Sequence, residues 1–275
     1  MDVDAYLARL GLGLPAAADL SALRRLQERH LERIPFENLS IHLGEPIELT
    51  EDALFDKIVT HRRGGFCYEL NGLFCGLLRE LGFTAELRGA YVFDCEGVPG
   101  PPLDHAAIVV YLGDEQWLVD VGFGRFARRP LRMAAVEAQT DPGGEFLFFD
   151  APHGDLDVVM NGKPAYRLER RARRLAEFGP MAWWQSTSPE SSFTGRLTCT
   201  RPTSQGRVTL SGHRLIETVD GVRHEVEMPT DEAVRSAYRV YFGITLTRLP
   251  APPDERPLTR AGARSDHEPL VGEQK

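Results

Sequence analysis

The stretch Arg63-Gly64-Gly65-Phe66-Cys67-Tyr68-Glu69-Leu70-Asn71-Gly72 places a cysteine where the sequence predicts the start of a helix. An apolar stripe at helical spacing follows Cys67, formed by Leu70, Leu73, Phe74, Leu77, Leu78 and Leu81. Gly82 is a natural end for this helix. Because Cys67 lies three residues before Leu70, it shares the buried face, and its sulfur should face the interior or a cleft. The helix dipole and the free N–H groups of the first turn favour a thiolate, which predicts covalent catalysis.

Length and composition predict a soluble globular protein. The 275 residues are 42% hydrophobic and 26% charged, and the net charge of −8 argues against nucleic acid as the main partner. No apolar run is long enough to cross a membrane, and the acidic N-terminus lacks the features of a signal peptide. The four cysteines form no CxxC pair, and no HExxH spacing appears. We therefore expect a cytoplasmic protein with free thiols and no metal, membrane or nucleic-acid partner.

Hydrophobic periodicity predicts an α+β chain in which helices come first and strands follow. Helices are expected over residues 20–31 and 51–59, the second with Thr50 as its N-cap. Strands are expected where β-branched and aromatic residues gather, over residues 85–93, 105–112, 116–121, 146–149, 156–160, 196–200, 207–211 and 213–218. A last helix is expected from Thr230 to Tyr238. The segment 251–275 is rich in proline and charge, which predicts a mobile tail.

A predicted hairpin brings a histidine and an aspartate to one face of the sheet. If the turn at Gly113-Asp114 is symmetric, Ala107 lies opposite Asp120. His105 then points to the same face as Asp120, in a diagonal pair whose backbones are about 7–8 Å apart. A register slip of one residue would put the two side chains on opposite faces. The register is therefore a testable part of the prediction.

Asp120 and His105 both stand in apolar strands, and each is the obvious partner for the other. With Cys67 they have natural catalytic roles. Cys67 would be the nucleophile, His105 would hold the thiol proton, and Asp120 would fix the imidazole tautomer and stabilise its charge. The backbone N–H of Cys67, at the helix start, would help to form an oxyanion hole.

The combined pattern resembles the arylamine N-acetyltransferases, in a bacterial-type form. The matching pieces, in the order and spacing of the family, are Arg33-Ile34-Pro35-Phe36-Glu37-Asn38-Leu39, residues 63–71 as quoted above, His105 at a strand start, and Val119-Asp120-Val121-Gly122-Phe123-Gly124. Residues 186–193 and Phe242-Gly243-Ile244 resemble later landmarks of the family. The resemblance covers roughly residues 1 to 250.

This resemblance implies a fold and a domain plan. It implies a helical domain over residues 1–84 that carries the nucleophile, and a β-barrel-like domain over 85–190 that carries His105 and Asp120. A C-terminal α/β lid over 191–250 and the tail complete the chain. The catalytic core would be like that of a cysteine protease, with Asp in place of Asn.

The resemblance also implies ping-pong acyl transfer from acetyl-CoA to an arylamine, arylhydrazine or arylhydroxylamine. Phe36, Val92 and Phe123 would line the acceptor pocket, since flat apolar walls suit an aromatic amine. Gly124, Arg125 and Phe126 would help to bind CoA. Arg125, Arg128 and Arg129 are candidates to meet its phosphates, with a solvated face as the plain alternative.

Three other functions stay open. The same triad would serve an amide synthase that closes a macrolactam. A cysteine hydrolase, in which water accepts the acyl group, is a second alternative. A non-catalytic binding module derived from the fold is a third. A binding module would be expected to lack a triad member, and none is missing. The acceptor, the preferred acyl group and the oligomeric state are not fixed by the sequence, and a homodimer is compatible with it.

Other noticeable residues have structural explanations. Cys75, Cys95 and Cys199 are expected to be ordinary small apolar residues, as most lone cysteines are. A buried ion-pair network that supports the cysteine loop is the expected role of Arg33, Glu37 and Glu69, with a catalytic role as the alternative.

Overall fold

The structure is a computed structural model that describes residues 1–251. The chain begins with a helical region, as the sequence predicts. Its helices are α1 (Val3–Leu10), α2 (Leu20–Arg33), α3 (Leu39–Leu43), α4 (Glu51–Phe55) and α5 (Cys67–Glu80). Thr50 caps α4 as expected, since its side chain accepts a hydrogen bond from the Ala53 N–H. The helix expected over 51–59 is real, but it continues from α4 as a π-helical turn over Asp56–Thr60.

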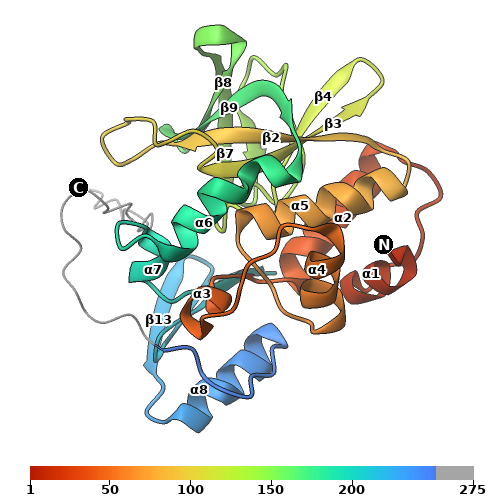
Figure 1. The fold of residues 1–275 in the computed structure, drawn as a ribbon. Coiled ribbons are helices and arrows are strands. Elements are labelled where there is room, and N and C mark those ends of the chain that lie inside the picture. The colour runs from red at the N-terminus through yellow and green to blue at the C-terminus, as the bar shows by residue number, and fades with distance from the viewer. Residues whose placement is uncertain (252–275) are drawn as a thin grey trace.

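Helix α5 begins at Cys67, as predicted, and forms the centre of this region (Figure 1). The stripe is buried from Leu70 to Leu78, and Leu81 is partly buried. Most of the remaining positions are buried too, and only Gly76 and the last turn reach solvent. The reason is that the helix lies between α1 and α4 on one side and strands of the larger sheet on the other. A sequence stripe alone predicts one buried face, whereas a helix enclosed by two layers buries nearly all of its surface.

The larger sheet has eight antiparallel strands in the order β5-β4-β3-β2-β9-β8-β7-β6 and forms the barrel-like part of the molecule. Its strands are β2 (Thr84–Val92), β3 (His105–Leu112), β4 (Glu115–Val119), β5 (Leu131–Arg132), β6 (Gln139–Asp141), β7 (Gly144–Asp150), β8 (Leu156–Met160) and β9 (Lys163–Arg173). The long strand β9 is not predicted from the sequence. Its second half is rich in arginine and largely exposed, so it lacks an alternating apolar pattern.

The predicted hairpin register is confirmed. Leu112 lies opposite Glu115 and Ile108 opposite Val119, as a symmetric turn at Gly113-Asp114 requires. One detail differs from the expected strand over 116–121, because β4 ends at Val119. Asp120 is therefore the first residue after the strand, where its carboxylate can turn toward the helical region.

The smaller sheet has five antiparallel strands in the order β1-β10-β11-β12-β13. They are β1 (Phe36–Glu37), β10 (Cys199–Thr203), β11 (Gly206–Ser211), β12 (Arg214–Val219) and β13 (Val222–Glu227). The helices after β9 are α6 (Gly179–Thr187), α7 (Ser192–Gly195) and α8 (Asp231–Ala237). A π-helical turn over Tyr238–Phe242 follows α8. The strand expected over 196–200 begins three residues later, and β13 was not expected because it is exposed along its whole length.

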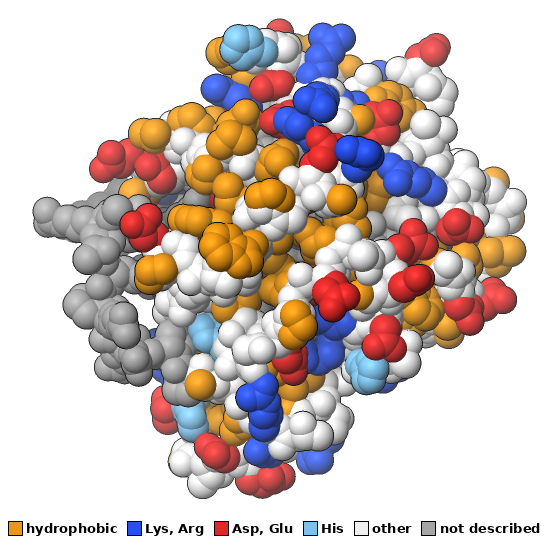
Figure 2. Space-filling view, viewed as in Figure 1, with side chains coloured by type: hydrophobic (Ala, Val, Ile, Leu, Met, Phe, Trp, Pro, Cys, Tyr) orange, Lys and Arg blue, Asp and Glu red, His pale blue; other side chains and the backbone are white. Residues whose placement is uncertain are grey.

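This arrangement confirms the predicted α+β class. We propose that residues 1–84, 85–190 and 191–250 are its three domains, although β1 pairs with β10 and so joins the first to the third. The tail expected over 251–275 lies outside the described residues except for Ala251. No helix within residues 1–251 is both long and apolar enough to cross a membrane. Figure 2 shows basic and acidic side chains mixed over the visible face, with apolar side chains gathered over α6 in its centre.

Candidate active site

Two glycines shape the loop that leads to the cysteine. A Cβ added at Gly64 would lie 2.0 Å from the Pro35 carbonyl oxygen, and one at Gly65 would lie 2.7 Å from Oε2 of Glu69. The loop therefore approaches β1 and α5 at distances that only glycine allows. The Glu37 N–H also donates to the Gly65 carbonyl at 2.9 Å. The glycine pair thus fixes the entry of the chain into α5, and with it the position of Cys67.

Buried ion pairs support this loop, but not with all the residues expected. Glu37 is fully buried and accepts from Arg63 Nε at 2.9 Å and from the Gly64 N–H at 3.2 Å. Burial opposes its ionisation, yet the charge of Arg63 holds the pKa of Glu37 below its usual value. Arg33, expected in this network, is instead exposed at the end of α2.

Glu69 belongs to a second pair of this kind. It accepts from Lys57 Nζ at 2.6 Å and from the Phe66 N–H at 3.1 Å, which caps the first turn of α5. Burial raises the pKa of Glu69, and Lys57 counteracts that shift. Glu37 and Glu69 therefore act on the backbone around the cysteine.

Asp120 is the best connected side chain of the site. Its Oδ2 accepts from His105 Nε2 at 2.7 Å and from the Tyr166 hydroxyl at 3.2 Å. Its Oδ1 accepts from Asn71 Nδ2 and from the Gly122 N–H, each at 2.9 Å. Asp120 is only 1% exposed, so these four donors replace the water that a carboxylate would otherwise bind.

His105 lies between the aspartate and the cysteine and is 2% exposed. Burial alone would lower its pKa, but the charge of Asp120 and hydrogen bonds with Asp120 and Cys67 raise it to about 10. The imidazole is also held by aromatic rings, with centroids 5.0 Å away for Phe123 and 5.2 Å away for Tyr166. The structure thus joins the three residues that the sequence picked out, and it favours the charged imidazolium.

Gly122 brings the turn after β4 against the start of α5. A Cβ at this position would lie 2.7 Å from the Cα of Cys67 and 2.7 Å from Nδ2 of Asn71. Asn71 completes the contact, because its Oδ1 accepts from the Val121 N–H at 3.0 Å and its Nδ2 donates to the Ala106 carbonyl at 2.6 Å. The helix and the two strands are therefore locked together around the triad.

Asn71 and Tyr166 hold Asp120 and were not recognised from the sequence. Asn71 did carry a signal, since it is a polar residue four positions after Cys67 and so lies one turn along the same face of the helix. Tyr166 carried none, because it lies on β9, the strand that was not predicted.

The residues expected to line an acceptor pocket lie on both sides of the turn after Asp120. Phe123 stacks edge-on against His105, and Val92, directly opposite Tyr166 on β9, packs into the same cluster as Phe123. Phe36 approaches the turn from β1, with ring atoms 3.9 Å from a Cβ built on Gly124. All three side chains are half-buried, so they stand at the boundary between core and solvent.

The same turn carries positive charge. Arg207 on β11 donates to the Gly124 carbonyl at 2.7 Å, and burial together with the charges of Arg125 and Arg128 lowers its pKa to about 10. Arg128 donates to two carbonyls of the β10–β11 turn, at 2.7 and 2.8 Å. Arg129 instead pairs with Glu28 at 2.6 Å.

Phe126 differs from its neighbours in this turn. Its side chain is 7% exposed and stacks on Tyr166, with ring centroids 5.3 Å apart. It belongs to the core of the larger sheet.

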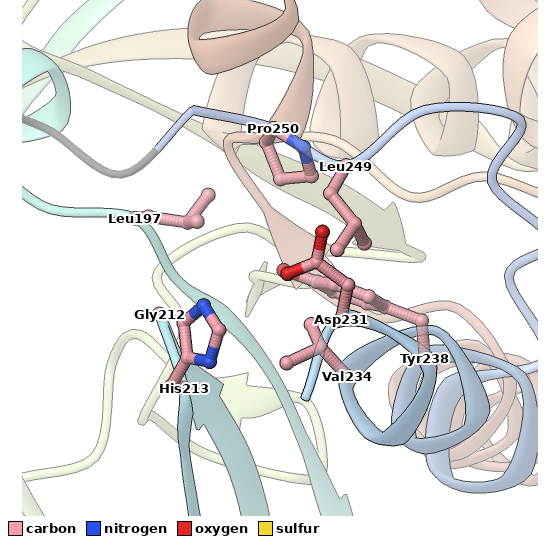
Figure 3. Close-up of a pocket in the computed structure, with 8 residues that line it drawn as sticks. All are labelled: Leu197, Gly212, His213, Asp231, Val234, Tyr238, Leu249 and Pro250. Carbon is pink, nitrogen blue, oxygen red and sulfur yellow. The ribbon is translucent and has the colours of Figure 1, made fainter. Parts of the chain in front are cut away.

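Two cavities lie away from the cysteine. One of about 230 Å³ is enclosed by the turn before β12, by α8 and by the segment at Leu249, with His213 and Asp231 among its lining side chains (Figure 3). Another of about 310 Å³ lies between α2 and the turn that holds Arg128 and Arg129. Neither is lined by a triad residue. Within residues 1–251, no cluster of His, Cys, Asp or Glu side chains could hold a metal ion.

Comparison with known proteins gives a consistent result. A family model described as N-acetyltransferase matches residues 19–250. The chain is 35% identical to an arylamine N-acetyltransferase of Mycolicibacterium smegmatis, over 90% of this chain and 94% of the relative. It is 32% identical to a Salmonella typhimurium relative named arylamine N-acetyltransferase / N-hydroxyarylamine O-acetyltransferase, over 98% of both chains.

Solved structures agree. The arylamine N-acetyltransferase structure from Salmonella typhimurium superposes with a TM-score of 0.82 and 31% identity, covering 88% of this chain and 90% of that one. The corresponding M. smegmatis structure gives a TM-score of 0.80 and 33% identity, covering 90% and 93%.

Proposed function

Since the chain belongs to the family of arylamine N-acetyltransferases and is an enzyme of this type, we propose that it moves an acetyl group from acetyl-CoA to an aromatic amine through an acyl-Cys67 intermediate. The observation that carries this proposal is a buried set of hydrogen bonds in which His105 joins Asp120 to Cys67. Cys67 is the first residue of α5. A thiol alone would support many reactions. A thiol with a charged imidazole and an oriented carboxylate supports nucleophilic acyl transfer.

In the first half-reaction, Sγ of Cys67 attacks the thioester carbonyl carbon of acetyl-CoA. Nε2 of His105 is bonded to Asp120, so Nδ1 is the ring nitrogen left for the thiol proton. The carbon–sulfur bond to CoA breaks, His105 returns its proton to the departing thiolate, and the acetyl group stays on Cys67. The Cys67 N–H, at the first helical position, would help to stabilise the oxyanion.

In the second half-reaction, the amine nitrogen attacks the acetyl carbon on Cys67. His105 accepts the proton that the amine loses, the carbon–sulfur bond to Cys67 breaks, and the thiolate–imidazolium pair is restored. The two half-reactions share one site and one base, which is the basis of a ping-pong sequence.

Both substrates would meet at the turn after Asp120. Phe36, Val92 and Phe123 would hold the aromatic acceptor, an arylamine, arylhydrazine or arylhydroxylamine. The hydroxylamine class has support from the name of the Salmonella typhimurium relative.

The CoA phosphates would bind at Gly124 and Arg125, where the neighbouring Arg128 and Arg207 add positive charge. Phe126 would contribute by shaping the turn, because its side chain is buried. We also propose a cytoplasmic location, since four free cysteines, one of them exposed, suit a reducing compartment.

Mass spectrometry of the acylated enzyme tests this function. The protein is incubated with acetyl-, propionyl- or malonyl-CoA and digested, and the Cys67 peptide is examined before and after addition of a small arylamine. The proposal requires acetylation of Cys67 that persists in water and disappears when the amine is added. Cys67→Ser is the matched control for background acylation. An acyl group lost to water as fast as to amine would indicate a hydrolase, and inertness to all three donors would contradict the proposal.

A further inference from the structure

Strand β13 forms the free edge of the smaller sheet. The other sheet edges are β1 and β5, with two residues each, and β6, with three, whereas β13 has six. All of β13 is exposed, and its register with β12 runs without a bulge from Val219–Val222 to Arg214–Glu227. It carries no proline. Long, regular edges of this kind are templates for pairing with another strand.

The turn before β13 decides which backbone groups face outward. Asp220 and Gly221 form a two-residue turn with φ values of 49° and 81°, so Val219 and Val222 are the hydrogen-bonded pair that closes the hairpin. Hydrogen bonding to β12 then alternates along the strand. The N–H and C=O groups of Arg223, Glu225 and Glu227 therefore point away from β12, toward the free edge.

These outward residues are complementary to themselves. In an antiparallel pair of two β13 strands centred on His224, Arg223 of each copy lies opposite Glu225 of the other. This register also places the outward groups in hydrogen-bonded pairs, giving about four backbone hydrogen bonds. Within one chain Arg223 and Glu225 already form an ion pair, so the two copies would join two such pairs into an alternating cluster of charge.

Neighbouring registers that keep the hydrogen-bond phase each add a like-charge pair. A shift of one step puts Glu225 opposite Glu225, although Arg223 then meets Glu227, and a shift the other way puts Arg223 opposite Arg223. Like charges directly opposite are unfavourable. The centred register also pairs the apolar side chains, since Val222 of each copy meets Val226 of the other. These valines are 56% and 51% exposed in the single chain, and pairing would cover them.

From this complementarity we infer that two copies of the chain associate through β13, about a twofold axis at His224, and join their five-stranded sheets into one. The contact area of one short strand is below that of standard stable interfaces, so the dimer is weak and reversible. The association involves neither the cysteine loop nor the turn after Asp120, and it is independent of the proposed chemistry.

Sedimentation velocity of the full chain over a wide concentration range tests this inference. Wild-type protein should show a reversible monomer–dimer equilibrium. Glu225→Arg and Arg223→Glu should each weaken dimerisation by about tenfold or more, because each places like charges opposite one another twice. An equimolar mixture of the two variants should restore the dimer, since the chain with two arginines meets the chain with two glutamates.

A backbone variant separates strand pairing from charge. Glu225→Pro removes an N–H that faces the free edge and leaves the bonds to β12 intact, so the monomer should keep its melting temperature while the dimer is lost. A wild-type chain that stays monomeric at the highest concentration would overturn the inference. So would a dimer that persists in Glu225→Pro, or failure of the mixed charge variants to associate.

Discussion

Asp120→Asn is the most informative single change in the site. The carboxylate accepts two donors on each oxygen, and asparagine has the same shape but only one oxygen. If that oxygen faces His105 and Tyr166, the new NH2 group meets the donors of Asn71 and Gly122. If it is turned over, the NH2 group faces His105 and Tyr166. In the first orientation two buried donors, Asn71 Nδ2 and the Gly122 N–H, lose their acceptor. In the second, His105 must change its tautomer and Tyr166 must turn its hydroxyl to accept from the NH2 group.

The expected magnitudes follow from this count. A buried donor without a partner costs about 1–3 kcal/mol, so the first orientation should lower the free energy of unfolding by about 2–6 kcal/mol, and the second by less. When the NH2 group faces Nε2 of His105, it forces the ring proton onto Nδ1, where the thiol needs a base. Loss of the correct tautomer in an analogous triad costs about 10⁴ in rate, or about 5 kcal/mol of transition-state stabilisation, and we expect a similar loss here.

Steady-state kcat/KM with acetyl-CoA and an arylamine measures the catalytic effect, and an NMR titration of His105 measures its cause. The pKa of His105, raised to about 10 in the wild type, should fall when the charge beside it is removed. Tyr166→Phe is the matched control, because it removes one donor and keeps the carboxylate, and it should cost about tenfold or less. The reasoning fails if Asp120→Asn stays within tenfold of wild type, or if its His105 pKa is unchanged.

Three other perturbations probe the site and the core. Below neutral pH, iodoacetamide should alkylate Cys67 faster than Cys95, although Cys67 is only 3% exposed and Cys95 is exposed. A peptide-mapping time course measures both rates, and the reverse order would contradict an activated thiol at Cys67. Gly122→Ala should reduce kcat/KM by about a hundredfold, because its Cβ would lie 2.7 Å from the Cα of the nucleophile, and unchanged kinetics would show that the turn can move aside. Burial chiefly lowers the pKa of His30 to about 3, so its neutral form contributes stability that is lost as pH falls from about 6.5 toward 3. In His30→Gln, the free energy of unfolding measured in urea should depend on pH less steeply by about 1.4 kcal/mol per pH unit near pH 5, and equal slopes would exclude this role.

The features that the sequence predicts correctly depend on local rules. The start of α5 follows from a stripe of side chains within fifteen residues, and the β3–β4 register follows from a two-residue turn. Because side-chain direction alternates with a period of two, a fixed turn is enough to place His105 and Asp120 on one face. The pairing of His105 with Asp120 is therefore predictable from the amino-acid sequence alone.

The features that the sequence does not predict depend on partners distant along the chain. Strand β9 is defined by its neighbours β2 and β8, and its own arginine-rich pattern resembles a surface loop. Tyr166 and Arg207 acquire their roles only when β9 and β11 meet the turn after Asp120. Arg33 is four residues from Glu37 but exposed, whereas Arg63, 26 residues away, reaches Glu37 through the fold.

The three triad residues therefore differ in what the fold requires of them. Cys67 packs as a small apolar side chain, so Cys67→Ala should abolish acyl transfer at a cost of only about 1 kcal/mol in stability. Asp120 accepts donors from β3, α5, β9 and its own turn, so its negative charge holds together elements that local sequence patterns do not connect. Because the carboxylate is needed to satisfy these donors even without substrate, its position is set by folding, and the ring of His105 is oriented as a consequence. Cys67 can be replaced without disturbing these hydrogen bonds, whereas Asp120 is the acceptor of all of them.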